Sequence, residues 1–193
     1  MPVFKRLYDR ALDWAAHPRA PWYLSALSFA ESSFFPVPPD VMLIPMMLSR
    51  PQRVWRLAAI CTLTSVAGGF VGYAIGSWAF HWIEPWLQES SYQGAFEAAI
   101  LAFKQWGFWF ILVAGFSPVP YKVFTISAGV AGMPLLPFLA GSAIGRGARF
   151  FLEALLIHLG GEQAAMKLRN WVDWIGWILV IVIIVAFLWI KLH

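Results

Sequence analysis

Charged residues are scarce in this sequence of 193 residues. Asp, Glu, Lys and Arg make up 12% of the chain and hydrophobic residues make up 60%, whereas an ordinary soluble domain carries about 25% charged residues. This composition excludes an ordinary water-soluble globular protein. A helix needs about 20 residues to cross the hydrocarbon core of a membrane. Three runs without Asp, Glu, Lys or Arg reach or approach that length: 57–83, 123–145 and 174–190.

Cysteine is almost absent as well. Cys61 is the single cysteine, so an internal disulfide and a cysteine cluster for a metal are both excluded. Neither HExxH nor GxSxG occurs, so nothing indicates an enzyme, and no cofactor or metal is implied. The net charge is +4, but the cations flank apolar runs, which favours membrane lipids over nucleic acid as partners.

Prolines and carboxylates interrupt the apolar stretch 21–49. Its middle contains Glu31 and Asp40 together with three prolines, Pro36, Pro38 and Pro39. Proline removes a backbone donor and disfavours helix at the preceding residue. Non-helical backbone at membrane depth is tolerated only where protein or a water-filled cavity surrounds it. We therefore predict a re-entrant hairpin with the prolines at its tip.

A second copy of this pattern occurs at an offset of 82 residues. Pro118 and Pro120 repeat Pro36 and Pro38, inside the apolar stretch 107–133. Each predicted hairpin precedes an apolar run with glycines four residues apart, a spacing that allows close helix packing. These helix-packing glycines are Gly68, Gly72 and Gly76 in the first run and Gly141 and Gly145 in the second.

The predicted fold is an all-α integral membrane protein with an inverted repeat. Two re-entrant helical hairpins are each followed by a Gly-rich transmembrane helix, and a C-terminal transmembrane helix is added. One crossing separates the hairpins, so they should enter from opposite faces. The single membrane domain, 1–193, comprises an interfacial amphipathic helix (1–20), hairpin 1 (21–49), a transmembrane helix (57–80), an interfacial segment (81–106), hairpin 2 (107–133) and two transmembrane helices (134–158 and 174–191). Arg50, Arg53 and Arg56 place the N-terminus in the cytoplasm by the positive-inside rule.

Ionisable groups at membrane depth indicate function. We expect Glu31 and Asp40 to bind protons or a cation, and Lys122, Arg146 and Arg149 to bind a phosphate headgroup. Asp40 and Lys122 occupy equivalent repeat positions, which predicts an ion pair between the hairpin tips. The spacing of Arg146, Arg149 and Glu153 predicts one helix face. The alternative is that these ion pairs only hold the hairpins in place.

The motifs resemble the DedA family, the bacterial branch of the SNARE-associated Golgi (VTT-domain) superfamily, and most of all its YqaA-type members. The resemblance rests on ESSFFPVPPD at 31–40, GGFVGY at 68–73, GFSPVPYK at 115–122 and AGVAGM at 128–133. It implies two opposed re-entrant hairpins and lipid transport that depends on the proton-motive force. Glu31 and Asp40 match the acidic positions of the family. The second hairpin departs from the family pattern, because Gly115 stands where many members have arginine and the cation Lys122 comes later.

The sequence thus predicts a flippase or scramblase of the bacterial inner membrane that moves a phosphate-bearing lipid, either a polyprenyl phosphate or a phospholipid. Large uncharged helix faces suit a homodimer. One alternative is a proton- or cation-coupled transporter of a small solute. The other is a non-transporting membrane scaffold, in which Glu31→Gln and Asp40→Asn should be tolerated.

Overall fold

The computed structural model describes residues 17–35, 37–88, 93–117 and 120–160. The C-terminal transmembrane helix predicted at 174–191, and nearly all of the interfacial helix predicted at 1–20, lie outside these residues. Every regular element in the described part is a helix. The elements are α2 (Ala20–Ser33), α3 (Asp40–Ser49), a 3-10 turn (Pro51–Arg53), α4 (Val54–Gln88), α5 (Gln93–Phe116), α6 (Tyr121–Val130) and a further helix over 135–160.

Proline and glycine set the helix boundaries around the two breaks. Pro39 is the N-cap of α3 and Pro120 the N-cap of α6, positions where a missing backbone donor costs no helical hydrogen bond. After α6, Gly132 adopts a φ of 61°, which glycine reaches without strain. The N–H of Met133 donates to the carbonyl of Ala128 at 3.0 Å and that of Gly132 to Gly129 at 3.1 Å. These two bonds form a Schellman motif that ends α6.

The region between the two predicted hairpins is more helical than expected. α4 continues to Gln88 and α5 begins at Gln93, so most of the interfacial segment predicted at 81–106 consists of the ends of two long helices. The helix-favouring residues Ala95, Glu97 and Ala98 lead directly into the apolar part of α5. No local signal at 107 therefore stops the helix from extending towards Gln93.

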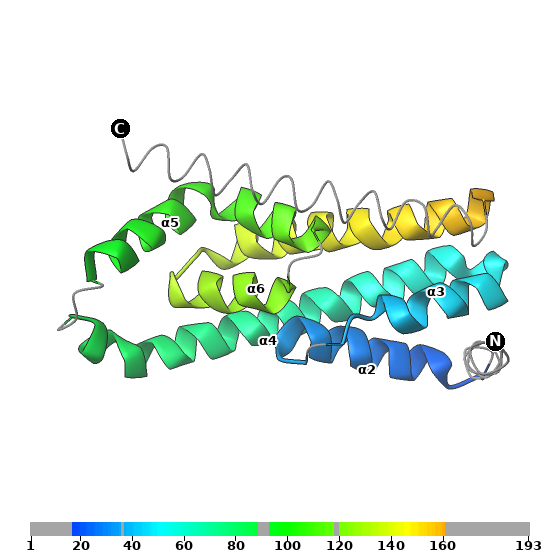
Figure 1. Cartoon of the computed structure of the whole chain (residues 1–193), viewed down its shortest axis with the longest axis horizontal. Coiled ribbons are helices and arrows are strands. Elements are labelled where there is room, and N and C mark those ends of the chain that lie inside the picture. The colour runs from blue at the N-terminus through cyan, green and yellow to red at the C-terminus, as the bar shows by residue number, and fades with distance from the viewer. Residues whose placement is uncertain (1–16, 36, 89–92, 118–119, 161–193) are drawn as a thin grey trace, which may run out of the picture.

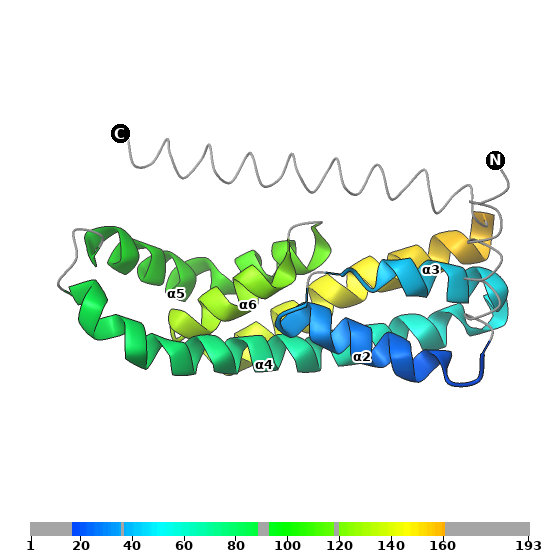
Figure 2. The same cartoon turned by 60° about the horizontal axis from the view of Figure 1, so that its bottom comes forward.

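α4 is the longest helix, and α2 and α6 both pack against it (Figures 1 and 2). Two of its glycines allow this packing, because a Cβ at Gly68 would collide with the Phe29 backbone of α2 and one at Gly76 with the Ile126 carbonyl of α6. A Cβ at Gly72, between them, would collide with the Thr125 side chain. The glycine ridge of α4 thus brings α2 and α6 to backbone contact.

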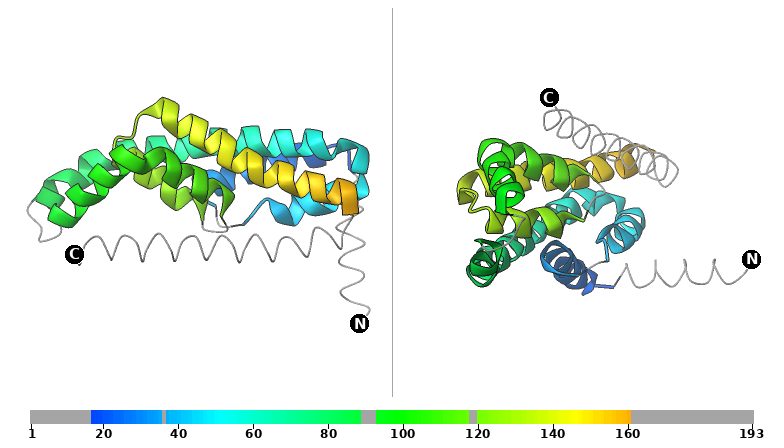
Figure 3. Two further views of the ribbon diagram at one scale, coloured as in Figure 1. Left: turned by 90° about the horizontal axis from the view of Figure 1, so that it is seen from above. Right: turned by 60° about the vertical axis from the view of Figure 1, so that its left-hand side comes forward.

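The helix over 135–160 packs against α5 in the same way (Figure 3). A Cβ at Gly141 would meet the Phe108 carbonyl at 3.0 Å, and one at Gly145 would collide with the Leu112 carbonyl. The same helix also reaches the start of α4, where the rings of Trp55 and Phe151 stack with centroids 6.2 Å apart. It therefore joins the α4 and α5 sides of the bundle.

The described surface is rich in large apolar side chains, whereas several polar ones are buried. Trp22, Leu63 and Leu136 are 78%, 70% and 79% exposed, while Ser65 is fully buried and Arg146 is 4% exposed. In the described residues, one helical stretch, Pro51–Trp82, is long and apolar enough to cross a membrane by length and composition. Two shorter apolar helices occur at Asp40–Ser49 and Ile100–Phe116.

Candidate functional site

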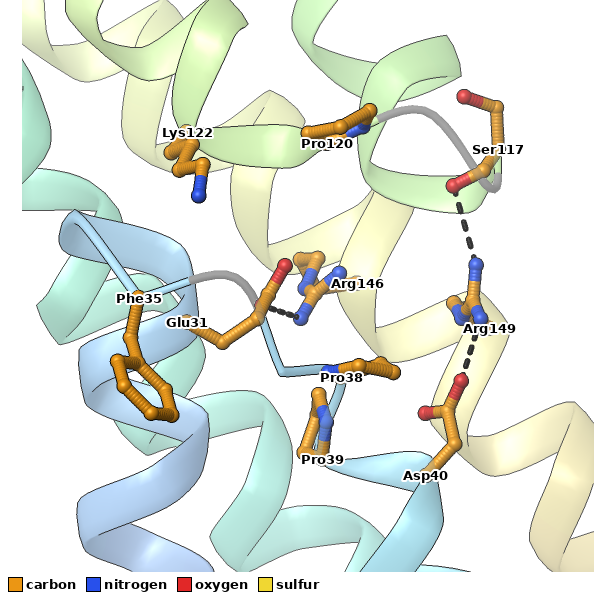
Figure 4. A pocket seen from close by; sticks show the side chains of 10 residues that line it. All are labelled: Glu31, Phe35, Pro38, Pro39, Asp40, Ser117, Pro120, Lys122, Arg146 and Arg149. Atoms are coloured by element: carbon orange, nitrogen blue, oxygen red, sulfur yellow. Dashed lines mark hydrogen bonds and ion pairs between the residues drawn. The ribbon is translucent and has the colours of Figure 1, made fainter.

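The two helix breaks meet at a charged pocket in the middle of the bundle (Figure 4). The cavity has a volume of about 190 Å³. Its lining comes from both breaks and from the helix over 135–160: Glu31, Phe35, Pro38, Pro39, Asp40, Ser117, Pro120, Lys122, Arg146 and Arg149. The site therefore gathers all five of the charged residues that the sequence singled out for proton and headgroup binding.

Arg146 forms the first ion pair, with Glu31 at the end of α2. Its Nη2 lies 2.7 Å from Oε2 of Glu31, and the two side chains are 4% and 12% exposed. The Nε of Arg146 donates to the hydroxyl of Ser65 on α4 at 2.5 Å. The guanidinium carbon lies 5.1 Å from the ring centroid of Tyr121 and 4.7 Å from that of Phe150. A counter-ion, a hydroxyl and two aromatic rings thus fix this cation in place.

Arg149 forms the second ion pair and joins the two breaks. Its Nη2 lies 2.6 Å from Oδ2 of Asp40, the first residue of α3. Its Nη1 donates to the backbone carbonyl of Ser117, in the break between α5 and α6, at 3.0 Å. Its Nε lies 3.7 Å from Oε1 of Glu153, one turn further along the same helix. One guanidinium therefore holds groups from both breaks and from its own helix.

The predicted ion pair between Asp40 and Lys122 is wrong. Asp40 pairs with Arg149 instead, and Nζ of Lys122 donates to the Phe34 carbonyl at the end of α2, at 3.3 Å. Both side chains do line the pocket. Asp40 and Lys122 thus lie at one pocket, but Arg149 is the cation that bonds to Asp40.

Two groups in the pocket keep hydrogen-bonding capacity. Lys122 carries three N–H donors, and one bond from it, to Phe34, is found among the described residues. Oδ1 of Asp40 is buried and accepts no hydrogen bond from any described group. Buried polar atoms without a partner are rare and call for an explanation in function. An additional acceptor at Lys122 and an additional donor at Asp40 would complete the site.

Three cations and two carboxylates line the cavity, and the Glu153 carboxylate lies outside the lining, 3.7 Å from Arg149. The lining alone therefore has a surplus of one positive charge, at Lys122, which forms no ion pair with a described carboxylate. An anion that carries one charge would neutralise this surplus. Four or more ligands of the right type are needed for most bound metals, and the described residues contain no group of three or more His, Cys, Asp or Glu that could hold one. The surplus therefore favours a monoanion as the ligand of this pocket.

The other predicted residues that the structure describes lie at the pocket or at helix contacts. Pro38, Pro39 and Pro120 line the cavity, while Pro36 and Pro118 lie outside the described residues. The five glycines lie at the contacts of α4 with α2 and α6 and of the 135–160 helix with α5. Cys61 is fully buried in the core with α2.

The sequence interpretation missed the uncharged polar residues that support the charges. Ser32 hydrogen-bonds to both Ser65, at 2.7 Å, and Glu31, at 3.1 Å, and so links the Glu31–Arg146 pair to α4. The hydroxyl of Tyr121 donates to Ser142 at 2.5 Å beside Arg146. Serine and threonine are common in apolar helices, so only their position in space separates these residues from the others.

Comparison with known proteins identifies the family. Two bacterial relatives are each similar over 191 residues, or 99% of this chain and 100% of theirs: an uncharacterized protein of Haemophilus influenzae, 44% identical, and one of Histophilus somni, 46% identical. No solved structure matches the chain significantly. The VTT domain matches residues 37–159, which include every pocket residue except Glu31 and Phe35, and proteins with this domain are membrane-associated. The chain therefore belongs to the VTT-domain family, in the DedA and SNARE-associated superfamily.

Proposed function

We propose that this protein moves a phosphate-bearing lipid between the two leaflets of the bacterial inner membrane, and that the charged pocket binds the headgroup. Membership of the VTT-domain family suggests a membrane transporter-like role. The observation that carries the lipid proposal is the buried pocket itself, with its surplus positive charge and the spare donors of Lys122.

The tryptophans of α4 support a position of the pocket near the middle of a bilayer. At a rise of 1.5 Å per residue, Trp55 and Trp78 are about 35 Å apart along the helix, close to the hydrocarbon thickness of about 30 Å. Both are exposed, at 42% and 67%, as residues of the two interfacial belts are. Ser65, which contacts Arg146, lies between them near the midpoint. Transporters commonly bind their substrates at this depth.

The helix boundaries support an inverted repeat of two re-entrant hairpins. At the sequence offset of 82, the helix boundaries of the two predicted repeats correspond. The end of α2 matches the end of α5, the two ends of α3 match those of α6, and the start of α4 matches the start of the last described helix. Each correspondence holds to within one residue. α3 and α6 have 10 residues each, too few to cross a membrane. Both features are those expected of short helices that return to the side they entered from.

Headgroup binding follows from competition with the carboxylates. A phosphate that enters the pocket first meets the Lys122 ammonium and can then replace Asp40 on Arg149, whose planar fork fits phosphate oxygens. Protonation of Asp40 weakens its hold on Arg149 and raises the positive surplus of the lining by one charge. Proton binding and phosphate binding therefore favour each other, which is the coupling that a proton-driven lipid transporter needs.

Lipid translocation in proteoliposomes tests this proposal. We would compare fluorescent phosphatidylglycerol and a fluorescent polyprenyl phosphate with a phosphate-free glycolipid, using wild type and Lys122→Gln. Lys104→Gln is the matched control, because Lys104 is exposed on α5 and does not line the pocket. We expect movement of a phosphate lipid by wild type and Lys104→Gln and at least tenfold slower movement by Lys122→Gln. Equal rates for the three proteins, or for lipids with and without phosphate, would refute the assignment of the pocket.

A further inference from the structure

A second pocket lies at the end of the bundle where α2 and α4 begin. Its cavity has a volume of about 170 Å³ and is lined by Pro18, Pro21, Trp22, Arg53, Arg56, Leu57 and Ile60. It shares no residue with the central pocket. Along α4, Arg56 precedes Ser65 of the central site by about 14 Å. The two pockets are therefore separate, one at an end of the bundle and one in its middle.

Among the described residues, the charges that line the end pocket are of one sign. Arg53 and Arg56 are both exposed, and neither forms an ion pair within the described part of the chain. The described stretches 17–30 and 41–60 contain no Asp or Glu. The 135–160 helix, which also reaches the start of α4, carries Glu153, whose carboxylate lies 3.7 Å from Arg149. The start of α4 adds the positive end of a helix dipole. Two unpaired guanidinium groups around a cavity can hold an anion, and their planar donors fit phosphate oxygens best.

The opposite wall of this pocket is apolar and continues along the helix. Leu57 is 4% exposed and forms the floor of the cavity, whereas Trp22 at its rim is 78% exposed. Arg56, Ile60 and Leu63 follow one another at helical spacing, so they lie on one stripe of α4, and Leu63 is 70% exposed. The stripe thus changes from cationic to apolar in the direction of the bilayer centre. This order complements an anionic phospholipid, whose negative headgroup is followed by apolar acyl chains.

The volume sets the size of the group that fits. A cavity of about 150 Å³ holds one benzene molecule, so the end pocket can take a phosphate with its neighbouring atoms but not a whole lipid. The acyl chains would then lie outside it, along Ile60 and Leu63. Basic pockets between membrane helices bind anionic headgroups in this way, and tryptophan favours the headgroup region.

We infer that this pocket is a resident site for an anionic phospholipid, which binds at the membrane surface and is not the lipid that passes through the central pocket. The inference uses the membrane placement on which the proposed function also rests, but it requires no transport. It gives the two exposed guanidinium groups at this cavity a ligand of opposite charge.

Native mass spectrometry of the detergent-purified full chain tests this inference. The probes are phosphatidylglycerol, phosphatidylcholine and inorganic phosphate. The variants are Arg53→Gln and Arg56→Gln, each of which should bind phosphatidylglycerol about fivefold more weakly, because one cation near the membrane surface contributes about 1 kcal/mol. Arg19→Gln is the matched control: it removes the same charge at the same end, but Arg19 does not line the pocket.

Lys122→Gln separates the two sites, because it alters the central pocket alone. The inference expects phosphatidylglycerol to bind more tightly than phosphatidylcholine. The affinity for one bound copy should be unchanged in Lys122→Gln and about fivefold weaker in Arg53→Gln and in Arg56→Gln. Equal binding of the two lipids, equal losses in Arg19→Gln and Arg56→Gln, or full displacement of the lipid by equimolar inorganic phosphate would each overturn it. If that copy is lost in Lys122→Gln instead, the bound lipid belongs to the central pocket and the inference is wrong.

Discussion

Neutralising both members of the Glu31–Arg146 pair should destabilise the protein much less than the sum of the two single neutralisations. The side chains are 12% and 4% exposed, so the loss of either leaves the other ion buried without its counter-charge. Breaking a buried pair in this way costs about 3–5 kcal/mol. We expect about 3 kcal/mol for Glu31→Gln, because Ser65 and the two aromatic rings still contact Arg146, and a similar loss for Arg146→Gln.

The double variant should be about 2–3 kcal/mol more stable than the sum of the single effects, since it buries no uncompensated ion. The Asp40–Arg149 pair, with its 2.6 Å contact, should give a coupling of the same sign. The assay is unfolding by SDS in mixed micelles, followed by circular dichroism. The crossed combinations, Glu31 with Arg149 and Asp40 with Arg146, are the controls and should show less than half that coupling. Equal coupling in all four combinations would refute the pairing described for this site.

Three further predictions concern packing, the support of Arg146 and topology. Gly76→Ala should destabilise the protein by about 1–3 kcal/mol in the same assay, since its Cβ would collide with the backbone of α6. Gly147→Ala is the control and should be neutral or stabilising, because its Cβ would have an ordinary 3.6 Å contact. A larger loss for Gly147→Ala than for Gly76→Ala would contradict the packing. Ser65→Ala should cost about 1–3 kcal/mol because it leaves Nε of Arg146 buried without its acceptor, and an unchanged stability would remove Ser65 from the site. Single cysteines at Gln52 and Gln88, in a cysteine-free background, should be labelled from opposite faces of the membrane, and labelling from one face would end the inverted-repeat proposal.

The sequence predicted the helix breaks and the gathering of charges because both have strong local causes. Proline disfavours the helix before it, so Pro39 and Pro120 indicated the positions where α3 and α6 begin. Charges cannot face lipid at low cost, so Asp40, Arg146 and Arg149 had to meet in the interior. Neither inference needed a knowledge of tertiary contacts.

The choice of partners could not be predicted in the same way. Asp40 and Lys122 line the same pocket, but which cation bonds to Asp40 depends on small differences in distance, and Arg149 is the one that bonds. The role of Ser65 could not be predicted for a similar reason. Its hydroxyl has the same sequence context as others in apolar helices, and only the fold places it beside Arg146. The helical extension of α5 to Gln93 shows a further limit, because no breaker separates its polar start from its apolar end.

The most direct test of lipid transport is the initial rate of translocation of fluorescent phosphatidylglycerol and polyprenyl phosphate in proteoliposomes, with an imposed pH gradient and without one. Protein-free liposomes give the baseline, and Asp40→Asn is the variant. We predict a wild-type rate well above baseline for at least one lipid, a change in that rate when the gradient is imposed, and a rate near baseline for folded Asp40→Asn. A wild-type rate at baseline for both lipids, or an Asp40→Asn rate equal to that of wild type, would contradict the account.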